Sequence, residues 1–399
     1  MSPTPFLRVF FAALLAVSPL AASGQVNPAP ALPDLNTAGE LGADIFAQSG
    51  STGMVLVVVR GDQVFFRGYG ETAPGSQQVP TEDSLVRLCS LTKIFTADLL
   101  TKLVADKTVG LDYTLERYAP RGAVVPERRG SITLEDLATH TSGLPRELRS
   151  SSRVPHFTFP DYRTRWHWLP NQRLSSTPGT EALYSNVAYD FLSDALAAAA
   201  HRQYAALLSE RTLKPLDMWS TTYFPTAEQC GRLLKSAHDE RACAFTEATA
   251  GSSGLYSSAR DMTIWLKYLL GTGGAGFPRQ DAAARAVYMK PADLVKQTGL
   301  DHAGQPTGVG LGWIHILPLD AESHIVEKTG GGAGFESYIA INDSRHTAIF
   351  VAATDGAVGS HLNLFNATNK LLLAVAGLPP LPEPPPRPVR RHAHRRRRS

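Results

Sequence analysis

Ser90-Leu91-Thr92-Lys93 pairs a hydroxyl and an amine at the start of a predicted helix. Residues three apart lie on one helix face, so the Ser90 hydroxyl and the Lys93 amine are expected side by side. A serine becomes a good nucleophile only when a nearby base takes its proton. Lys93 could be that base if burial or neighbouring cations lowered its pKa from about 10.4 by roughly 3 units.

Tyr184-Ser185-Asn186 precedes a long stretch rich in Ala and Leu. A tyrosine hydroxyl can relay a proton, and an asparagine amide can both donate and accept hydrogen bonds. The motif could therefore assist a serine nucleophile and hold a substrate amide.

Lys328-Thr329-Gly330-Gly331 lies at the end of a predicted strand. A cation beside a hydroxyl suits a substrate carboxylate. Glycines let a substrate backbone approach closely, and a free backbone N–H can stabilise an oxyanion. Each of the three motifs is weak alone, but their order places them where they would border one cleft.

The sequence lacks the signature motifs of several other classes of enzyme. Gly251-Ser252-Ser253-Gly254 is not the G-x-S-x-G elbow of α/β-hydrolases, and the sequence has no H-E-x-x-H motif or phosphate-binding loop. These absences disfavour an α/β-hydrolase and a zinc peptidase. Lys and Arg number 39 against 36 Asp and Glu. Residues 381–399 alone hold seven Arg and one Glu, so the tail carries more than the whole positive excess and the body of the chain is net negative. A nucleic-acid-binding domain is therefore disfavoured.

The N-terminus is typical of an export signal. Arg8 precedes the apolar run Val9 to Leu20, and small residues follow up to Gly24. The run is too short to span a membrane, which takes about 20 residues. We expect residues 1–24 to be a signal peptide, cleaved after Ser23 or Gly24, and the mature protein to be exported; an uncleaved anchor is the alternative.

An oxidising compartment makes Cys230 and Cys243 a candidate disulfide, with two free thiols as the alternative. Cys89 is then a buried apolar residue. Residues 381–399 are rich in Pro and Arg and are expected to be disordered. This tail could contact an anionic membrane or envelope polymer, or simply be solvated.

The apolar pattern predicts strands at both ends of the chain and helices between them. The expected strands are 54–60, 63–70, 310–317, 323–328, 336–341 and 347–354. The expected helices include 35–48, 131–140, 187–208, 282–290 and 361–375. A further helix is expected after Ser84, because Leu91, Phe95, Leu99 and Leu103 recur at every fourth residue. An isolated hairpin is only marginally stable, so both ends should share one antiparallel sheet. The fold class is therefore α/β (α+β), with sheet parts about 34–125 and 300–380 and a helical insert about 126–299.

The three motifs, in this order, resemble those of the penicillin-recognising serine hydrolases, specifically the class C β-lactamase-like branch. The resemblance covers nearly all of residues 34–377, and within the branch the chain looks most like the AmpH-type D-alanyl-D-alanine carboxypeptidase/endopeptidases. His140 to Glu147 (HTSGLPRE) and the pair Cys230/Cys243 support this likeness. Cys89 and the Arg-rich tail depart from it. The resemblance implies a β-lactamase/transpeptidase-like fold over residues 34–380.

The resemblance also implies roles for the residues of the motifs. Ser90 would form an acyl-enzyme, and Lys93 and Tyr184 would share the proton transfers. The substrate would be bound by Asn186, Lys328, Thr329 and Gly330, and the backbone N–H groups of Ser90 and Gly331 would form the oxyanion hole. The implied partners are peptidoglycan stem peptides (muropeptides) and β-lactams, and the implied location is the periplasm. The resemblance implies no metal and no organic cofactor.

Two alternative functions stay open. One is a class C-type β-lactamase or promiscuous esterase on the same scaffold, which differs in how fast water attacks the acyl-enzyme. The other is a non-catalytic penicillin-binding or muropeptide-sensing protein. The aromatic segment His156 to Trp168 either lines a groove for peptidoglycan or packs the helical insert, and we expect a structural role for His140.

Overall fold

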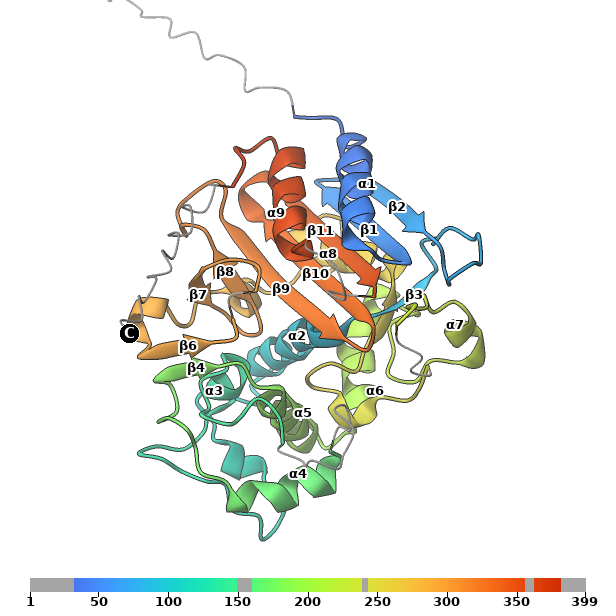
Figure 1. Ribbon diagram of the computed structural model, residues 1–399. Helices are drawn as coiled ribbons and strands as arrows, with labels where there is room; N and C mark the ends of the chain where they lie inside the picture. Colours follow the sequence, from blue (N-terminus) through green and yellow to red (C-terminus); the bar gives the residue numbers. More distant parts are fainter. Residues whose placement is uncertain (1–31, 149–159, 239–242, 301, 356–361, 382–399) are drawn as a thin grey trace, which may run out of the picture. The chain divides into compact units, whose positions relative to one another are not determined.

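A seven-stranded antiparallel sheet lies at the centre of the fold, in the order β2-β1-β11-β10-β9-β8-β7 (Figure 1). The computed structural model describes residues 32–148, 160–238, 243–300, 302–355 and 362–381. All the elements below belong to one unit, Pro33–Ser399. The sheet strands are β1 (Gly53–Arg60), β2 (Gln63–Gly70), β7 (Pro306–Val309), β8 (Ile314–Ile316), β9 (Ile325–Gly332), β10 (Phe335–Asn342) and β11 (Thr347–Thr354).

Strands from the two ends of the chain meet in the middle of this sheet, as the sequence predicted. β1 pairs with β11, so that Met54 lies opposite Ala353. Val57 of β1 packs into the core on one face of the sheet, and Leu56 packs into the core on the other. Burial on both faces explains why β1 is a continuous apolar run rather than an alternating one.

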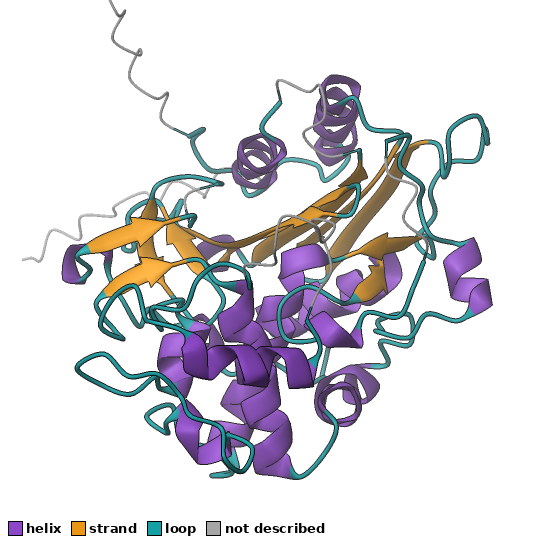
Figure 2. Ribbon diagram, turned by 60° about the horizontal axis from the view of Figure 1, so that its bottom comes forward, coloured by secondary structure: helices purple, strands orange, loops and turns teal. Residues whose placement is uncertain are grey.

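Helices cover both faces of the sheet (Figure 2). On one face lie α1 (Thr37–Ser49) and α9 (Leu364–Val375), which contact each other. On the other face α8 (Ala259–Leu270) packs against β1 and β11, and the helical part continues beyond it with α2 (Thr92–Ala105) at its centre. The remaining helices are α3 (Leu134–Ala138), α4 (Tyr162–Trp168), α5 (Asn186–Ala200), α6 (Tyr204–Leu208) and α7 (Ala227–Gly231).

Two short strand pairs border the helical part, and neither was predicted from the sequence. β3 (Leu85–Arg87) pairs antiparallel with β5 (Tyr256–Ser258), and β4 (Glu181–Leu183) pairs parallel with β6 (Lys296–Thr298). Their strands are too short for an apolar period to be recognisable. They matter because β3 leads directly to Ser90 and β4 leads directly to Tyr184.

Three predicted elements differ in the structure. The helix expected over 187–208 stops at Ala200, because His201 adopts φ 51° and closes the helix end, and α6 follows. The strand expected over 310–317 is a strand only at β8, Ile314–Ile316, because residues 310–313 form the turn between β7 and β8, in which Gly312 has φ 76°. The helix expected over 282–290 is wrong beyond Arg285. There the N–H groups of Tyr288 and Met289 donate to Val309 O, so pairing with the sheet edge overrides local helix propensity.

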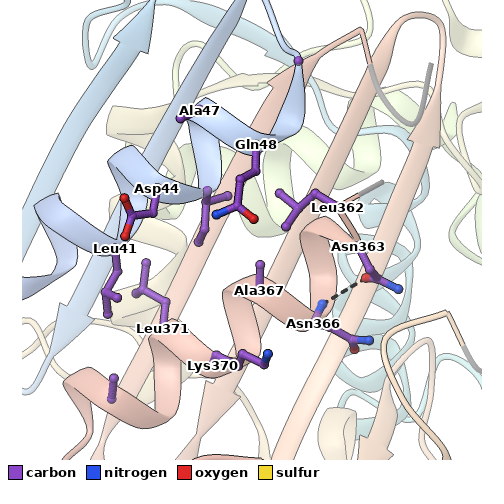
Figure 3. Close-up of a pocket in the computed structure, with 13 residues that line it drawn as sticks. Leu41, Asp44, Ala47, Gln48, Leu362, Asn363, Asn366, Ala367, Lys370 and Leu371 are labelled. Carbon is purple, nitrogen blue, oxygen red and sulfur yellow. Dashed lines mark hydrogen bonds between the residues drawn. The ribbon is translucent and has the colours of Figure 1, made fainter. Parts of the chain in front are cut away.

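A cavity of about 880 Å³ opens between α1 and α9, as the side chains in Figure 3 show. Its lining includes Leu41 and Asp44 from α1 and Asn366 and Lys370 from α9. These helices cover the opposite face of the sheet from α8 and the helical part. The cavity shares no residue with the three motifs.

The structure contains the predicted disulfide between Cys230 and Cys243, while Cys89 is buried and takes no part in a disulfide. The bridge joins α7 to a segment 13 residues further along the chain, and closing a loop of that size contributes roughly 3 kcal/mol on the chain-entropy model. We predict that thiol titration of the unfolded, unreduced protein finds one free thiol per chain. Three free thiols would refute the bridge.

Candidate active site

Ser90 lies in a tight turn, Cys89–Leu91, that joins β3 to α2. Cys89 has φ 50°, and this left-handed residue turns the chain from the strand into the helix. The Cys89 thiol donates to Gly332 O at 3.3 Å, which ties the turn to the end of β9. Ser90 itself stays partly exposed, so its hydroxyl is accessible.

Gly330 packs directly against this turn. A Cβ at Gly330 would lie 2.7 Å from Leu88 O and 2.3 Å from Ser337 Oγ, distances at which no side chain fits. The third residue of the Lys-Thr-Gly motif is therefore glycine because β9 must approach the backbone before Ser90. The next residue, Gly331, is exposed and has open space around it.

Two predicted partners meet the Ser90 hydroxyl. The Tyr184 hydroxyl is hydrogen-bonded to Ser90 Oγ at 2.7 Å, and Lys93 Nζ lies 3.3 Å from the same oxygen. The sequence placed Lys93 one helical turn after Ser90, but Tyr184 arrives from 94 residues away. The structure thus brings the first two motifs into direct contact.

Lys93 is fully buried, and its amine has two further partners. Nζ donates to Asn186 Oδ1 at 2.6 Å and to Ser252 O at 2.7 Å. A neutral amine has two hydrogens, and these two carbonyl oxygens take both of them. Its lone pair is then left for the third contact, the Ser90 hydroxyl. The geometry therefore lets a neutral Lys93 accept the proton of Ser90.

The surroundings of Lys93 favour this neutral form. Burial lowers the pKa of Lys93 to about 7, and the charge of Arg146 acts in the same direction. The carboxylates of Asp190 and Glu147 oppose this shift and raise the pKa. Lys93 needs a pKa lowered in this way to act as a base near neutral pH.

Asp190 is a buried site residue that the sequence analysis missed. It lies four residues after Asn186 on α5, on the same helix face, and that spacing was a usable signal. Its Oδ1 is buried and has no hydrogen-bond partner within the described residues, and its negative charge acts on Lys93. Burial raises the pKa of Asp190 to about 7, against the opposing charges of Arg165 and Lys93.

Asn186 links Lys93 to the loop before α5. Its Oδ1 accepts from Lys93, while its Nδ2 donates to the Glu147 carboxylate. Both ends of the amide have partners in the protein, and one N–H of Nδ2 remains for a substrate. Its expected role in substrate binding is therefore combined with a role in holding Lys93.

Lys328 and Thr329 reach the site from β9. Lys328 Nζ lies 5.1 Å from the centre of the Tyr184 ring and is almost fully buried. Burial lowers the pKa of Lys328, while Tyr184 and Glu327 act to raise it. Thr329 is half-buried, and its hydroxyl has no hydrogen bond within the described part of the chain.

Three basic side chains surround the Tyr184 ring. The amines of Lys93 and Lys328 and the guanidinium of Arg146 lie 4.9, 5.1 and 4.8 Å from its centre. Cations favour the face of an aromatic ring, and they also attract an anionic ligand. The site is therefore suited to a substrate that carries a carboxylate.

His140 packs against the aromatic residues of the site. Its ring lies against Tyr184 and Tyr189, with centroid distances of 4.6 and 5.0 Å, and Nδ1 accepts from Ser185 N at 3.1 Å. Burial and the charge of Lys93 hold the pKa of His140 well below its usual range. A neutral imidazole fixed in this way positions the Tyr184 segment, in line with the structural role expected for it.

Part of the aromatic segment predicted near the site lies outside the described residues, namely 156–159. In the described part, Trp166 of α4 packs edge-on against Phe191 of α5 and donates to Asp194 at 2.8 Å. Arg165 forms a buried ion pair with the same carboxylate. These contacts make α4 a packing element of the helical part.

Comparison with known proteins places this site in a family. A family model described as Beta-lactamase matches residues 38–365, a range that contains all three motifs. The chain belongs to the beta-lactamase family. This membership confirms the resemblance inferred from the motifs.

Relatives within the beta-lactamase family resemble the chain over most of its length. The D-alanyl-D-alanine-carboxypeptidase/endopeptidase AmpH of Escherichia coli strain K12 is 40% identical over 339 residues, or 84% of this chain and 88% of the relative. The crystal structure of a beta-lactamase/D-alanine carboxypeptidase from Yersinia pestis, complexed with citrate, is 38% identical with a TM-score of 0.80, covering 86% of this chain and 99% of that one.

The fold is also shared with more distant members of the family. A class C beta-lactamase from Rhodobacter sphaeroides matches with a TM-score of 0.67 and 24% identity over 85% of this chain and 99% of that one. These matches confirm the predicted fold, an antiparallel sheet built from both ends of the chain and flanked by helices.

Proposed function

We propose that this protein is a serine D-alanyl-D-alanine carboxypeptidase/endopeptidase that acts on peptidoglycan stem peptides through a Ser90 acyl-enzyme. The observation that carries the proposal is the Ser90 hydroxyl, which is held by Tyr184 and lies beside a buried Lys93 whose other two contacts are carbonyl oxygens. The name of the Escherichia coli relative supports the choice of substrate.

In this mechanism Ser90 Oγ attacks the carbonyl carbon between the two D-alanines. Its proton passes to neutral Lys93 or through Tyr184, and the departing amine takes up a proton from the same pair. The backbone N–H groups of Ser90 and Gly331 stabilise the oxyanion, which fits the open position of Gly331. Water then hydrolyses the acyl-enzyme.

The substrate is bound on both sides of Ser90. Lys328 and Thr329 hold the terminal carboxylate, and the free N–H of Asn186 holds the amide of the acyl part. Gly330 contributes through its close packing, which sets the path of β9. A penicillin acylates Ser90 in the same way, and its amine stays attached because the bond that breaks is part of a ring.

The test is incubation with purified muropeptides and, separately, with a chromogenic β-lactam, followed by product analysis. We expect release of D-alanine or cleavage of cross-links, together with slow turnover of the β-lactam. Fast β-lactam turnover without cleavage of any muropeptide would instead identify a β-lactamase. Labelling by penicillin with no turnover of either substrate would identify a non-catalytic binding protein.

Acylation should speed up with rising pH through about 7, because neutral Lys93 is the form that accepts the proton. Asp190→Asn removes the anion that most favours protonated Lys93, so the pKa of Lys93 falls and the rise moves to lower pH. The measurement is the rate of Ser90 labelling by a fluorescent penicillin between pH 5 and pH 9.

Asp194→Asn is the matched control for this prediction. Asp194 is buried one turn further along α5, but its carboxylate is paired with Arg165 and Trp166. This variant should lose stability and keep the pH profile. Equal displacement of the profile in both variants would assign it to helix damage rather than to the charge of Asp190.

We also propose that residues 1–24 direct the protein to the periplasm and are then removed. These residues lie outside the described part of the structure, as does the Arg-rich tail beyond residue 381. Within the described residues, no helix combines the length and the apolar character that crossing a membrane requires. N-terminal sequencing of protein from the periplasmic fraction tests the cleavage at Ser23 or Gly24.

A further inference from the structure

The strand pair β3–β5, which leads to Ser90, is too short to be stable by itself. Each strand has three residues, and the pair is separate from the seven-stranded sheet. A two-stranded ribbon of this size is marginal in water, so its position depends on the segments bonded along it. Leu88 N donates to Leu255 O at 2.9 Å and extends the pairing to the turn that carries Ser90. A shift of the strand pair would therefore displace the nucleophile.

The chain that follows Cys230 is bonded to β3. Two residues after this cysteine, Arg232 O accepts from Leu85 N at 2.8 Å, and Leu234 N donates to Leu85 O at 2.9 Å. Leu233 thereby lies beside Leu85 in a parallel bridge, so that the segment after α7 runs along β3 (Figure 1). One end of the disulfide thus belongs to the segment that supports the first strand of the pair.

The chain that follows Cys243 is bonded to β5. Its first residue, Ala244, makes two hydrogen bonds to the Tyr256 hydroxyl, donating through its N–H at 3.2 Å and accepting through its carbonyl oxygen at 3.0 Å. The same hydroxyl accepts from Arg87 Nη1 at 2.6 Å, and Arg87 is the last residue of β3. Because Tyr256 is almost fully buried, these bonds form a fixed connection from the disulfide to a point three residues before Ser90.

The segment after Cys243 also contacts the loop that binds Lys93. Thr246 Oγ1 donates to Gly254 O at 2.5 Å. A Cβ at Gly254 would lie 2.6 Å from Thr246 O, so the two backbones are in direct contact there. Gly254 follows Ser252 by two residues, and Ser252 O is the acceptor of a Lys93 hydrogen. The nucleophile and its candidate base are therefore both supported by segments that the disulfide joins.

We propose that the Cys230–Cys243 disulfide positions Ser90 for acylation by fixing the two segments that support the strand pair β3–β5. This inference rests on the proposed function, in which Ser90 is the nucleophile. Without the bridge the hydrophobic cores on both faces of the sheet remain, but the strand pair gains freedom to move. Ser90 then spends less time where Tyr184 and Lys93 both reach its hydroxyl. A misplacement of about 1 Å can cost on the order of 100-fold in rate.

The test follows the labelling of Ser90 by excess fluorescent penicillin with and without the bridge. One sample is the variant Cys230→Ser with Cys243→Ser, and another is wild-type protein treated with dithiothreitol. This dithiol gives the bridge two electrons and two protons, which leaves two thiols, while its own sulfurs join in a ring. In both samples we expect the rate constant for labelling to fall about tenfold, and the final amount of label per folded molecule to stay the same.

Leu372→Ala is the matched control for loss of stability. Leu372 is fully buried in α9, in the core on the opposite face of the sheet, so its truncation lowers the melting temperature without a change near β3 or β5. All labelling is measured below the melting temperature of every variant. Lost stability reduces the amount of folded protein, whereas a displaced nucleophile reduces the rate constant of the folded molecules. The control should therefore keep the wild-type rate constant.

Tyr256→Phe tests the connection itself. This variant removes the hydroxyl that joins Ala244 to Arg87, and it keeps both the aromatic ring and the bridge. We expect a fall of about threefold in the rate constant for labelling. Combined with the two serine substitutions, it should add little further loss, because changes that act through one connection are not additive.

The outcomes separate the inference from the function on which it rests. An unchanged rate constant without the bridge, or an equal fall in Leu372→Ala, would overturn the positioning role and leave the proposed function standing. Fully additive losses with Tyr256→Phe would also overturn it, because the bridge would then act by another route. If the penicillin does not label Ser90 in the wild-type protein, the proposed function fails together with the inference. A slower rate at full final labelling supports the positioning role.

Discussion

Replacing Ser90 by alanine will abolish covalent labelling by a fluorescent penicillin and lower hydrolysis of any substrate by about 10⁴-fold or more, the scale seen when a nucleophile is removed. The hydroxyl is the atom that Tyr184 and Lys93 both contact. The packing around it comes from other residues, since Leu91 and Phe95 are fully buried and Ser90 is not. The fold should therefore survive the change.

Gel fluorescence and a thermal melt of Ser90→Ala check both halves of this prediction. Ser131→Ala removes a hydroxyl that, among the residues the structure describes, bonds only Glu127, and it serves as the control with normal labelling. If the variant is still labelled, and peptide mapping finds the label on a different serine, then Ser90 is not the nucleophile.

Replacing Lys328 by alanine will lower kcat/KM for a D-alanyl-D-alanine peptide by roughly 10- to 150-fold. The loss corresponds to the contribution of a charge-assisted hydrogen bond, about 1.5–3 kcal/mol. Lys328 is almost fully buried beside Tyr184, so a substrate carboxylate would meet this cation in a largely dry site. Lys296→Ala, which removes an exposed lysine from β6, is the control.

A second substrate decides which role Lys328 has. A neutral ester that acylates Ser90 has no carboxylate, so it should lose much less activity if Lys328 is the anchor for that group. The charge of Lys328 also lies close to Tyr184, and it could act on proton transfer instead. Equal losses on the peptide and the ester would reject the anchor and favour the second role.

The parts of the site that the sequence predicted are those with a local signal. Ser90 and Lys93 share a helical turn, so their spacing alone placed them together. β1 and β11 were recognisable because burial on both faces makes them long apolar runs. The encounter of Tyr184 with Ser90 followed only from the combination of three motifs with an expected cleft.

The parts that the sequence did not predict depend on contacts between distant segments. Asp190 acts on Lys93 through its charge, and although Asp190 shares a helix face with Asn186, no local pattern links α5 to the lysine on α2. In the sequence, Arg146 and Glu147 resemble any charged loop. Their connection to the site depends on the hydrogen bonds that Asn186, at the beginning of α5, donates to both of them. Residues 286–290 favour a helix by composition, and only the presence of β7 explains why they do not form one.

The pairing of β1 with β11 also determines when the protein can become active during its synthesis. Gly53 and Thr354 are hydrogen-bonded across 301 residues, so the centre of the sheet cannot form until nearly the whole chain has left the ribosome. Contacts this distant in sequence make folding slow. The segment just before Ser90 packs against Gly330, which is also synthesised late because it lies near the C-terminal end of the chain. A growing chain therefore has its nucleophile long before it has the strand that shapes it, and activity is a property of the completed chain alone.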